Sequence, residues 1–370
     1  MRQTPEWYDR MYNNRALVPE HGSILERWAR DSATTRKQLR HALIDVAYGH
    51  GPGETLDVFP APSKPGTPPA PVLVFIHGGY WRALDKADHS FVAEAFTAAG
   101  ACVVVPNYAL CPAVTIPHIT LQMAHALAWT WHHIGEWGGD RRRITVAGHS
   151  AGGHLAAMML ACRWPQVGAD LPAALVRNAL SVSGLFDLEP LRLAPSLQSS
   201  LKLTPDQVRK ASPARLPSPG LRQGRGELVA VVGGQESGEY HRQNHLIREA
   251  WGAEVVPVCE ALPGLNHFSA LDALVAPDHR LHTLARHLLG QQAATALARA
   301  DAGHIHVRHL QQALSQQRHR FARRVAAAVG RLVVVGHRSQ PVAVGRHQFL
   351  AEEFGQAGQA VAVVQEEAGC

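Results

Sequence analysis

The sequence Ile144-Thr-Val-Ala-Gly-His-Ser-Ala-Gly-Gly153 decides the fold. Residues 144–147 are an apolar run of the buried-strand type, and residues 151–162, rich in Ala, Leu and Met, indicate a helix. Between them, Gly-x-Ser-x-Gly places Ser150 at a tight turn whose backbone leaves room only for small neighbours. An incidental serine in a glycine-rich turn is the alternative, but the flanking strand and helix favour a nucleophile exposed at a helix N-terminus.

Strand-like and helical segments alternate on both sides of this turn. This alternation predicts an α/β fold with a mostly parallel central sheet and helices on both faces. The expected strands are residues 56–59, 72–76, 101–105, 144–147, 179–182, 228–232 and 255–258. The expected helices are residues 6–13, 24–43, 117–137, 151–162, 239–251 and 267–289.

We expect one domain over residues 1–290, followed by a different segment, residues 291–370. Within the domain, residues 1–45 form an N-terminal helical segment that either covers a pocket as a lid or simply packs. Residues 188–225, rich in Pro, Ser and Leu, indicate an insertion over one edge of the sheet.

The charge of the chain gives no reason to expect a nucleic-acid partner. Its 36 Lys and Arg and 30 Asp and Glu give a net charge of +6. Nine Arg and five acidic residues lie in residues 291–370, so this segment holds most of the excess and residues 1–290 are nearly neutral. A near-neutral domain lacks the basic surface that binds a phosphate backbone. Recruitment of nucleic acid by the basic C-terminal segment is kept only as a minor alternative.

Residues 291–370 also differ in composition, because they contain no Trp, Tyr, Met, Asn or Lys. With few large apolar side chains to offset the entropy of ordering, we expect an extension outside the core. Three interpretations stay open: a disordered or weakly helical tail, a partner-binding extension, and an artefactual end such as a frameshift.

Cysteine usage and hydropathy bear on the compartment. The five cysteines are odd in number and form no Cys-x-x-Cys pair, which argues against a disulfide framework and a zinc ribbon. The first ten residues lack the apolar core of a signal peptide, and no apolar run approaches 18 residues. We therefore expect a cytoplasmic protein with no membrane partner, and we expect no metal or organic cofactor.

A glycine pair after the strand 72–76 predicts an oxyanion hole. Gly78 and Gly79 lie in the sequence His77-Gly-Gly-Tyr-Trp81, where small residues bring backbone N–H groups close to a substrate. Together with the N–H of Ala151, these donors would hold the oxygen that becomes negative when Ser150 attacks a carbonyl. An ordinary Gly-Gly loop is the alternative.

A serine nucleophile needs a base and an orienting acid. His267 follows the last expected strand and opens a helix, which is the usual position of the base. Glu236 follows the strand 228–232 and is our choice for the acid. Glu239 fits less well because an acid in the first turn of a helix is common, and Asp187 is the rival.

Five stretches resemble the kynurenine formamidases (arylformamidases) of the α/β-hydrolase superfamily. The resemblance runs from about residue 8 to residue 289 and includes Tyr12-Asn-Asn-Arg-Ala-Leu-Val-Pro19. The five stretches are His77-Gly-Gly-Tyr-Trp81, Pro106-Asn-Tyr-Ala-Leu-Cys-Pro112, Gly148-His-Ser-Ala-Gly-Gly153, Ser183-Gly-Leu-Phe-Asp-Leu188 and Glu236-Ser-Gly-Glu-Tyr-His-Arg-Gln243. The resemblance implies a triad of Ser150, Glu236 and His267, although relatives carry Asp where this chain has Glu236.

The same resemblance implies hydrolysis of N-formyl-L-kynurenine to L-kynurenine and formate through a formyl-enzyme, a step of tryptophan breakdown. Tyr80 and Trp81 would then offer flat walls for an aromatic small-molecule substrate, and Arg82 is one unassigned candidate for its carboxylate. Two other functions remain open: a general carboxylesterase for small acyl esters, and a non-catalytic binding protein on a hydrolase scaffold. The sequence leaves the oligomeric state open, with a homodimer among the options.

Overall fold

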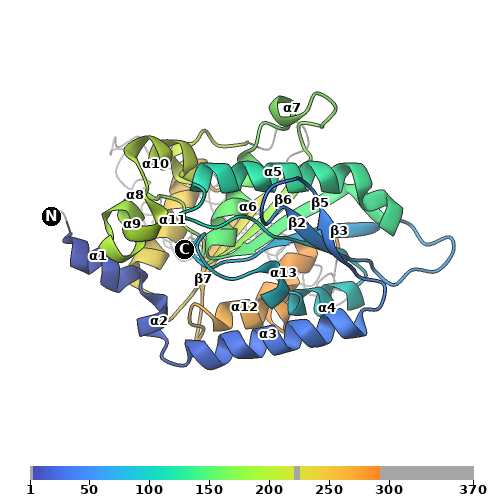
Figure 1. The fold of residues 1–370 in the computed structure, drawn as a ribbon, viewed down its shortest axis with the longest axis horizontal. Coiled ribbons are helices and arrows are strands. Elements are labelled where there is room, and N and C mark those ends of the chain that lie inside the picture. The colour runs from blue at the N-terminus through green and yellow to red at the C-terminus, as the bar shows by residue number, and fades with distance from the viewer. Residues whose placement is uncertain (1–2, 221–225, 292–370) are drawn as a thin grey trace, which may run out of the picture. The chain divides into compact units, whose positions relative to one another are not determined.

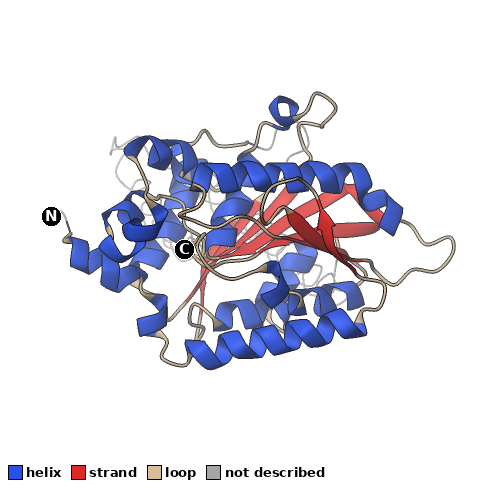
Figure 2. Cartoon of the chain, in the orientation of Figure 1, coloured by secondary structure: helices blue, strands red, loops and turns tan. Residues whose placement is uncertain are grey.

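The centre of the molecule is an eight-stranded sheet (Figures 1 and 2). The computed structural model describes residues 3–220 and 226–291. In spatial order the strands are β1, β2, β4, β3, β5, β6, β7 and β8. β2 is antiparallel to β1 and β4, and every pair from β4 to β8 is parallel. The strands are β1 (Leu43–Ala47), β2 (Thr55–Phe59), β3 (Ala70–Ile76), β4 (Cys102–Pro106), β5 (Gly139–His149), β6 (Val176–Val182), β7 (Leu228–Gly233) and β8 (Val258–Leu262).

The apolar run of β3 shows why this sequence forms a central strand. Val72, Val74 and Ile76 belong to one core, whereas Leu73 and Phe75 belong to the core on the other face. Successive side chains of a strand point to opposite faces, so a strand covered on both sides needs apolar residues at every position. The register aligns Val74 of β3 with Val104 of β4 on one side and with Val146 of β5 on the other.

Helices cover both faces of the sheet, which confirms the predicted α/β architecture. Figure 1 shows α5 and α6 above the sheet and α3, α4, α12 and α13 below it. The upper core joins α5 (Ile116–His133), α6 (Ala151–Ala161) and α11 (Gly238–Trp251) to the sheet. The lower core joins α3 (His21–Gln38), α4 (Phe91–Ala98), α12 (Ser269–Val275) and α13 (Arg280–Leu288).

Shorter helices gather at one end of the sheet, where α1 contacts α8, α9 and α11 (Figure 1). Three of them follow β6 and make up half of the predicted insertion 188–225, of which residues 221–225 lie outside the described part. The remaining helices are α1 (Pro5–Tyr12), α2 (Asn14–Leu17), α7 (Trp164–Val167), α8 (Glu189–Leu193), α9 (Pro195–Leu201) and α10 (Pro205–Ala211), and the short 3₁₀ turns are η1 (Lys86–Asp88), η2 (Ile134–Trp137) and η3 (Pro213–Arg215).

Two predicted elements near prolines were wrong in extent. The last strand is β8 rather than residues 255–258, because Pro257 has no N–H for the ladder, and pairing with β7 starts at Val258. The carbonyl of Val255 accepts instead a single hydrogen bond from the N–H of Leu228. The predicted helix 267–289 is split into α12 and α13, because Pro277 disfavours helical backbone at the residue before it.

The predicted helix 24–43 was also wrong, because the helix ends at Gln38 and Leu43 begins β1. β1 pairs with β2, with Leu43 opposite Val58. This pairing supplies backbone hydrogen bonds from a distant segment, which local periodicity cannot reveal. The predicted segment 1–45 therefore contains three helices and the start of an edge strand.

The extension predicted for residues 291–370 lies outside the described residues except for Gln291, which donates a 2.8 Å hydrogen bond to the carbonyl of Ala99. In the part of the chain that is described, no helix has both the length and the hydropathy needed to cross a bilayer.

Candidate active site

Ser150 lies at a strained turn between β5 and α6. Its backbone has φ 58° and ψ −117°, in the positive-φ region that residues other than glycine rarely adopt. A Cβ atom on Gly148 would overlap the carbonyl of Gly152, and one on Gly152 would overlap the carbonyl of Ile76. The two glycines are therefore required by close packing of the turn, as the motif predicted.

The base and acid predicted from sequence are in contact. His267, in the loop between β8 and α12, and Glu236, between β7 and α11, are joined by a 2.6 Å hydrogen bond from Nδ1 to Oε2. The side chains are only 6% and 1% exposed. The other carboxylate oxygen accepts bonds from Ser183 Oγ at 2.5 Å and from the N–H of Gly233 at 2.7 Å. Glu236 is thus held as an oriented acceptor, which fixes the direction of the imidazole.

His149, the residue before the nucleophile, holds the backbone of this histidine. Its Nε2 lies 2.7 Å from the carbonyl oxygen of His267, so the ring must donate there. The pKa of His149 is held well below its usual range, mainly by burial and to a lesser extent by the nearby His267. A neutral His149 holds the backbone of His267 and places no positive charge beside its ring.

Ser150 is 3% exposed and is hydrogen-bonded to the hydroxyl of Tyr240. Among the bonds that the described residues make, none joins Ser150 directly to His267. Hydrogen bonds between a nucleophile and its base are often long in a protein without substrate and tighten only when substrate is bound. Both residues line one pocket.

The hydroxyls around Ser150 form a directed chain. Tyr80 lies 2.7 Å from the carbonyl of Tyr12, which can only accept, so the single proton of Tyr80 is used there. The hydroxyl of Tyr240, 2.6 Å from that of Tyr80, must then donate to it. The oxygen of Tyr240 is left to accept from Asn14 Nδ2 at 2.8 Å and from Ser150.

The loop after β3 holds the predicted oxyanion donors. A Cβ on Gly78 would lie 3.2 Å from the Cβ of Ser150, so the loop backbone passes directly beside the nucleophile. The hydroxyl of Tyr108 donates to the carbonyls of His77 and Gly78 at 2.9 and 3.1 Å. Gly79 has φ 105° and lines the pocket with Ser150.

The three predicted donors have free N–H groups in the described part of the chain. Neither Gly78 nor Gly79 donates a backbone hydrogen bond there. Ala151 begins α6, so its N–H has no acceptor within the helix. The arrangement suits the stabilisation of a negative oxygen next to Ser150.

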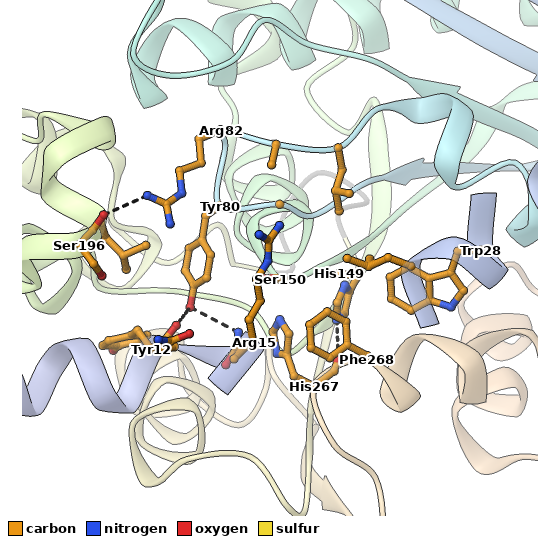
Figure 3. A pocket seen from close by; sticks show the side chains of 17 residues that line it. Tyr12, Arg15, Trp28, Tyr80, Arg82, His149, Ser150, Ser196, His267 and Phe268 are labelled. Carbon is orange, nitrogen blue, oxygen red and sulfur yellow. Dashed lines mark hydrogen bonds between the residues drawn. The ribbon is translucent and has the colours of Figure 1, made fainter. Parts of the chain in front are cut away.

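The pocket has a volume of about 340 Å³. Figure 3 shows aromatic side chains from distant parts of the chain around it, including Trp28, Tyr80 and Phe268. Seventeen residues line it: Tyr12, Asn13, Asn14, Arg15, Leu25, Trp28, Gly79, Tyr80, Arg82, Ala83, Leu84, His149, Ser150, Ser196, Leu197, His267 and Phe268. The lining therefore combines aromatic rings with polar and positively charged side chains beside the buried Ser150.

The two predicted substrate-binding aromatics separate in the structure. Tyr80 lines the pocket, whereas Trp81 does not. Trp81 is fully buried in the upper core, where its ring meets that of His154 edge to face at a centroid distance of 5.0 Å. Positive φ values at both residues turn their side chains in different directions, which a two-residue motif cannot specify.

The rival acids have other partners. Asp187 Oδ1 lies 2.9 Å from Arg215 Nη2 and accepts from the N–H of Glu189. Glu239 pairs with Arg242 at 2.8 Å and accepts a 2.7 Å bond from Tyr12. Of the three carboxylates considered from sequence, Glu236 is the one that contacts His267.

Sequence reasoning missed the polar wall made by Asn14 and Tyr240. Both residues lie in stretches that carried the family resemblance, Tyr12–Pro19 and Glu236–Gln243, but only the fold brings these stretches together. Over the residues that the structure describes, no group of three or more His, Cys, Asp or Glu could hold a metal ion.

Comparisons with known proteins show that this chain is similar to hydrolases. The BD-FAE family model matches residues 56–166. The kynurenine formamidase of Salmo salar is 28% identical over 291 residues, which cover 77% of this chain and 93% of that protein. Esterase LipC of Mycobacterium tuberculosis is 36% identical over 143 residues, 38% of this chain and 35% of LipC. A crystal structure described as a putative thioesterase from Silicibacter sp. TM1040 is similar with a TM-score of 0.63 and 32% identity, covering 74% of this chain and 96% of that one.

Proposed function

We propose that this protein, which belongs to the α/β-hydrolase superfamily and is an enzyme related to the kynurenine formamidases, hydrolyses N-formyl-L-kynurenine to L-kynurenine and formate. The observation that carries the proposal is the buried His267–Glu236 pair, whose histidine lines one pocket with Ser150. This arrangement supplies a nucleophile, a base and an orienting acid beside an aromatic cavity.

In the first half of the reaction, Ser150 Oγ attacks the formyl carbon and its proton passes to Nε2 of His267. Nδ1 of the same ring donates to Glu236, which stabilises the imidazolium that forms. The N–H groups of Gly78, Gly79 and Ala151 stabilise the tetrahedral oxyanion. The imidazolium then protonates the aryl nitrogen as the carbon–nitrogen bond breaks, so L-kynurenine leaves and a formyl ester remains on Ser150.

In the second half, water attacks the formyl ester. His267 accepts a proton from this water and returns one to Ser150 Oγ when the ester bond breaks, which releases formate. The leaving aryl amine would lie between aromatic rings of the pocket. Trp28 and Phe268, whose ring centroids are 6.1 Å apart, would be on one side of it and Tyr80 on another. The small formyl group suits a nucleophile that is almost fully buried.

A carboxylesterase is the second candidate, because the same groups cleave esters by the same steps. The similarity to esterase LipC and to the structure described as a putative thioesterase favours it. The substrate decides between the two functions. Rapid cleavage of 4-nitrophenyl acetate with no measurable turnover of N-formyl-L-kynurenine would reject the formamidase and leave the esterase.

The role of Ser150 is tested by Ser150→Ala in the full chain. We expect kcat/KM on N-formyl-L-kynurenine to fall by on the order of 10⁴ or more, because the covalent step is lost while the fold is kept. Circular dichroism checks the fold, and Ser23→Ala, an exposed serine of α3, is the matched control. A Ser150→Ala variant that retains more than a tenth of the activity would reject the proposed nucleophile.

A further inference from the structure

Arg15 has an unusual position in the pocket. It follows Asn14 in the short helix α2 and is one of two arginines in the lining, the other being Arg82. Figure 3 shows its side chain extending from α2 toward the part of the view where Ser150 and Tyr80 are labelled, and both of those residues line the same pocket. An exposed arginine would normally extend into water.

The two arginines differ in what their donors do. Arg82 Nη1 donates to the carbonyl of Ser196 at 3.0 Å and to Ser200 Oγ at 2.6 Å, so its guanidinium is tied to α9. Arg15 makes no hydrogen bond or ion pair with any residue in 3–220 or 226–291. Its planar fork of N–H donors is therefore available to a ligand, and that fork matches a carboxylate in two parallel bonds.

The charge of the lining favours an anion. The lining contains Arg15, Arg82 and two histidines, and it contains no Asp or Glu among the described residues. The acid of the site, Glu236, stands behind His267 and is bonded to it. Arg15 is exposed, so a carboxylate entering this pocket would meet a solvent-screened positive charge and no facing carboxylate among the described lining residues.

The backbone that carries Arg15 is anchored on both sides. Asn14 is 6% exposed and donates to Tyr240, and the hydroxyl of Tyr80 donates to the carbonyl of Tyr12. The side chain of Asn13 caps α2 by accepting from the N–H of Ala16 at 3.1 Å. The residues before Arg15 are thus hydrogen-bonded to Tyr80 and Tyr240, and Tyr240 is also the partner of Ser150.

We propose that Arg15 determines substrate selectivity by binding a carboxylate on the leaving group of the substrate. The inference rests on the proposed hydrolase function and narrows its substrate class to aryl amides or esters whose leaving group carries a negative charge. Arg82 was the candidate from sequence because it follows Tyr80 and Trp81. Its guanidinium is bonded to α9, so we expect it to contribute less to binding of the carboxylate.

The test compares two aryl acetates, one with a carboxylate on the leaving group and one without it: 4-acetoxyphenylacetate and 4-methylphenyl acetate. Wild-type protein is expected to prefer the charged ester in kcat/KM. Arg15→Gln should lower that preference by about 10- to 100-fold, mainly through KM, because a charge-assisted pair is lost. Arg15→Lys should retain part of the preference, since it keeps the charge and loses the fork.

Three comparisons make the result decisive. Arg82→Gln should lower the preference less than Arg15→Gln does, and Arg30→Gln, an exposed arginine of α3 outside the lining, is the matched control. A preference that changes less than twofold in Arg15→Gln overturns the proposal, as does a larger loss in Arg82→Gln. If the wild-type protein cleaves neither ester, calorimetric binding of 4-hydroxyphenylacetate replaces turnover, and equal affinity for wild type and Arg15→Gln overturns the proposal.

The two proposals can fail separately. If the wild-type protein does not cleave N-formyl-L-kynurenine but Arg15→Gln lowers the preference for the charged ester, the formamidase function is rejected and the role of Arg15 is supported. If the wild-type protein cleaves N-formyl-L-kynurenine and Arg15→Gln leaves KM unchanged, the formamidase function is supported and the role of Arg15 is rejected.

Discussion

Two regions of the molecule are built in different ways: the carboxyl edge of the sheet and the N-terminal wall of the pocket. We define the wall as α1 and α2 (residues 5–17). The edge carries Ser150, Glu236 and His267 directly after strands or in the loops that follow them. The wall reaches the site only through contacts with remote segments, such as the bond between Tyr12 and Glu239, 227 positions apart. The proposed catalytic residues are therefore positioned by the sheet, whereas the wall is positioned by contacts with remote segments.

The two regions also differ in how firmly they are held. The edge is fixed by buried strands and by turns with positive φ at Ser150 and Ser183. The wall is held by the buried ring of Tyr12 in the upper core and by side-chain hydrogen bonds. These include Ser237 Oγ to the carbonyl of Met11 at 2.6 Å and Ser196 to Asp9. Since one such bond contributes about 1 kcal/mol net, the wall should open locally before the edge unfolds.

The largest effect is expected from breaking the edge at Glu236. Glu236→Gln retains the shape of the side chain but presents a neutral amide to His267. The imidazolium then loses its charge partner, and the imidazole is no longer held in one tautomer. We expect kcat to fall by about 10³- to 10⁴-fold with a small change in KM, as measured by steady-state kinetics. Asp187→Asn is the matched control, and an equal loss in both variants would contradict the assignment of the acid.

Acid should weaken the edge through buried histidines. Burial lowers the pKa of His77, His89 and His154 to about 4 each. Because the unfolded chain has a histidine pKa near 6.5, it binds more protons than the folded chain between pH 6.5 and 4. The free energy of unfolding should therefore fall as the pH is lowered through that window, by roughly 2 kcal/mol for each histidine at pH 5.

Urea denaturation at pH 7 and pH 5 measures this loss. His154→Gln, which retains a donor for the carbonyl of Ala211, should show a smaller difference between the two pH values than wild type. Equal differences would mean that His154 is not held neutral in the folded protein.

The smallest effect is expected from loosening the wall at Tyr12. Tyr12→Phe removes the hydroxyl that donates to Glu239 at 2.7 Å and accepts from Gln243 at 3.0 Å. We expect the free energy of unfolding to fall by about 1–2 kcal/mol and KM to rise more than kcat falls, because the wall positions substrate. Tyr8→Phe is the control on the same helix. A loss confined to kcat would show that the wall takes part in the chemistry.

Much of the edge could be predicted because its signals are short. The Gly-x-Ser-x-Gly turn, the glycine pair after β3 and the strand-end positions of Glu236 and His267 are all local patterns. Apart from the two elements misjudged at Pro257 and Pro277, the errors arose where a distant partner decides the outcome. β1 forms by pairing with β2, and Trp81 turns into the core although its neighbour Tyr80 lines the pocket.

What the sequence determined by itself was the alternation of strands and helices, and with it the edge at which the reactive residues meet. Parallel strands bring their carboxyl ends to one side of a sheet whatever the loops contain. Only the tertiary structure decided that Asn14, Tyr80 and Tyr240 share one hydrogen-bonded cluster. It also decided that Arg15 lines the pocket without a hydrogen-bond partner among the described residues. Such contacts join segments more than 60 positions apart, so they depend on how the helices pack rather than on any local pattern.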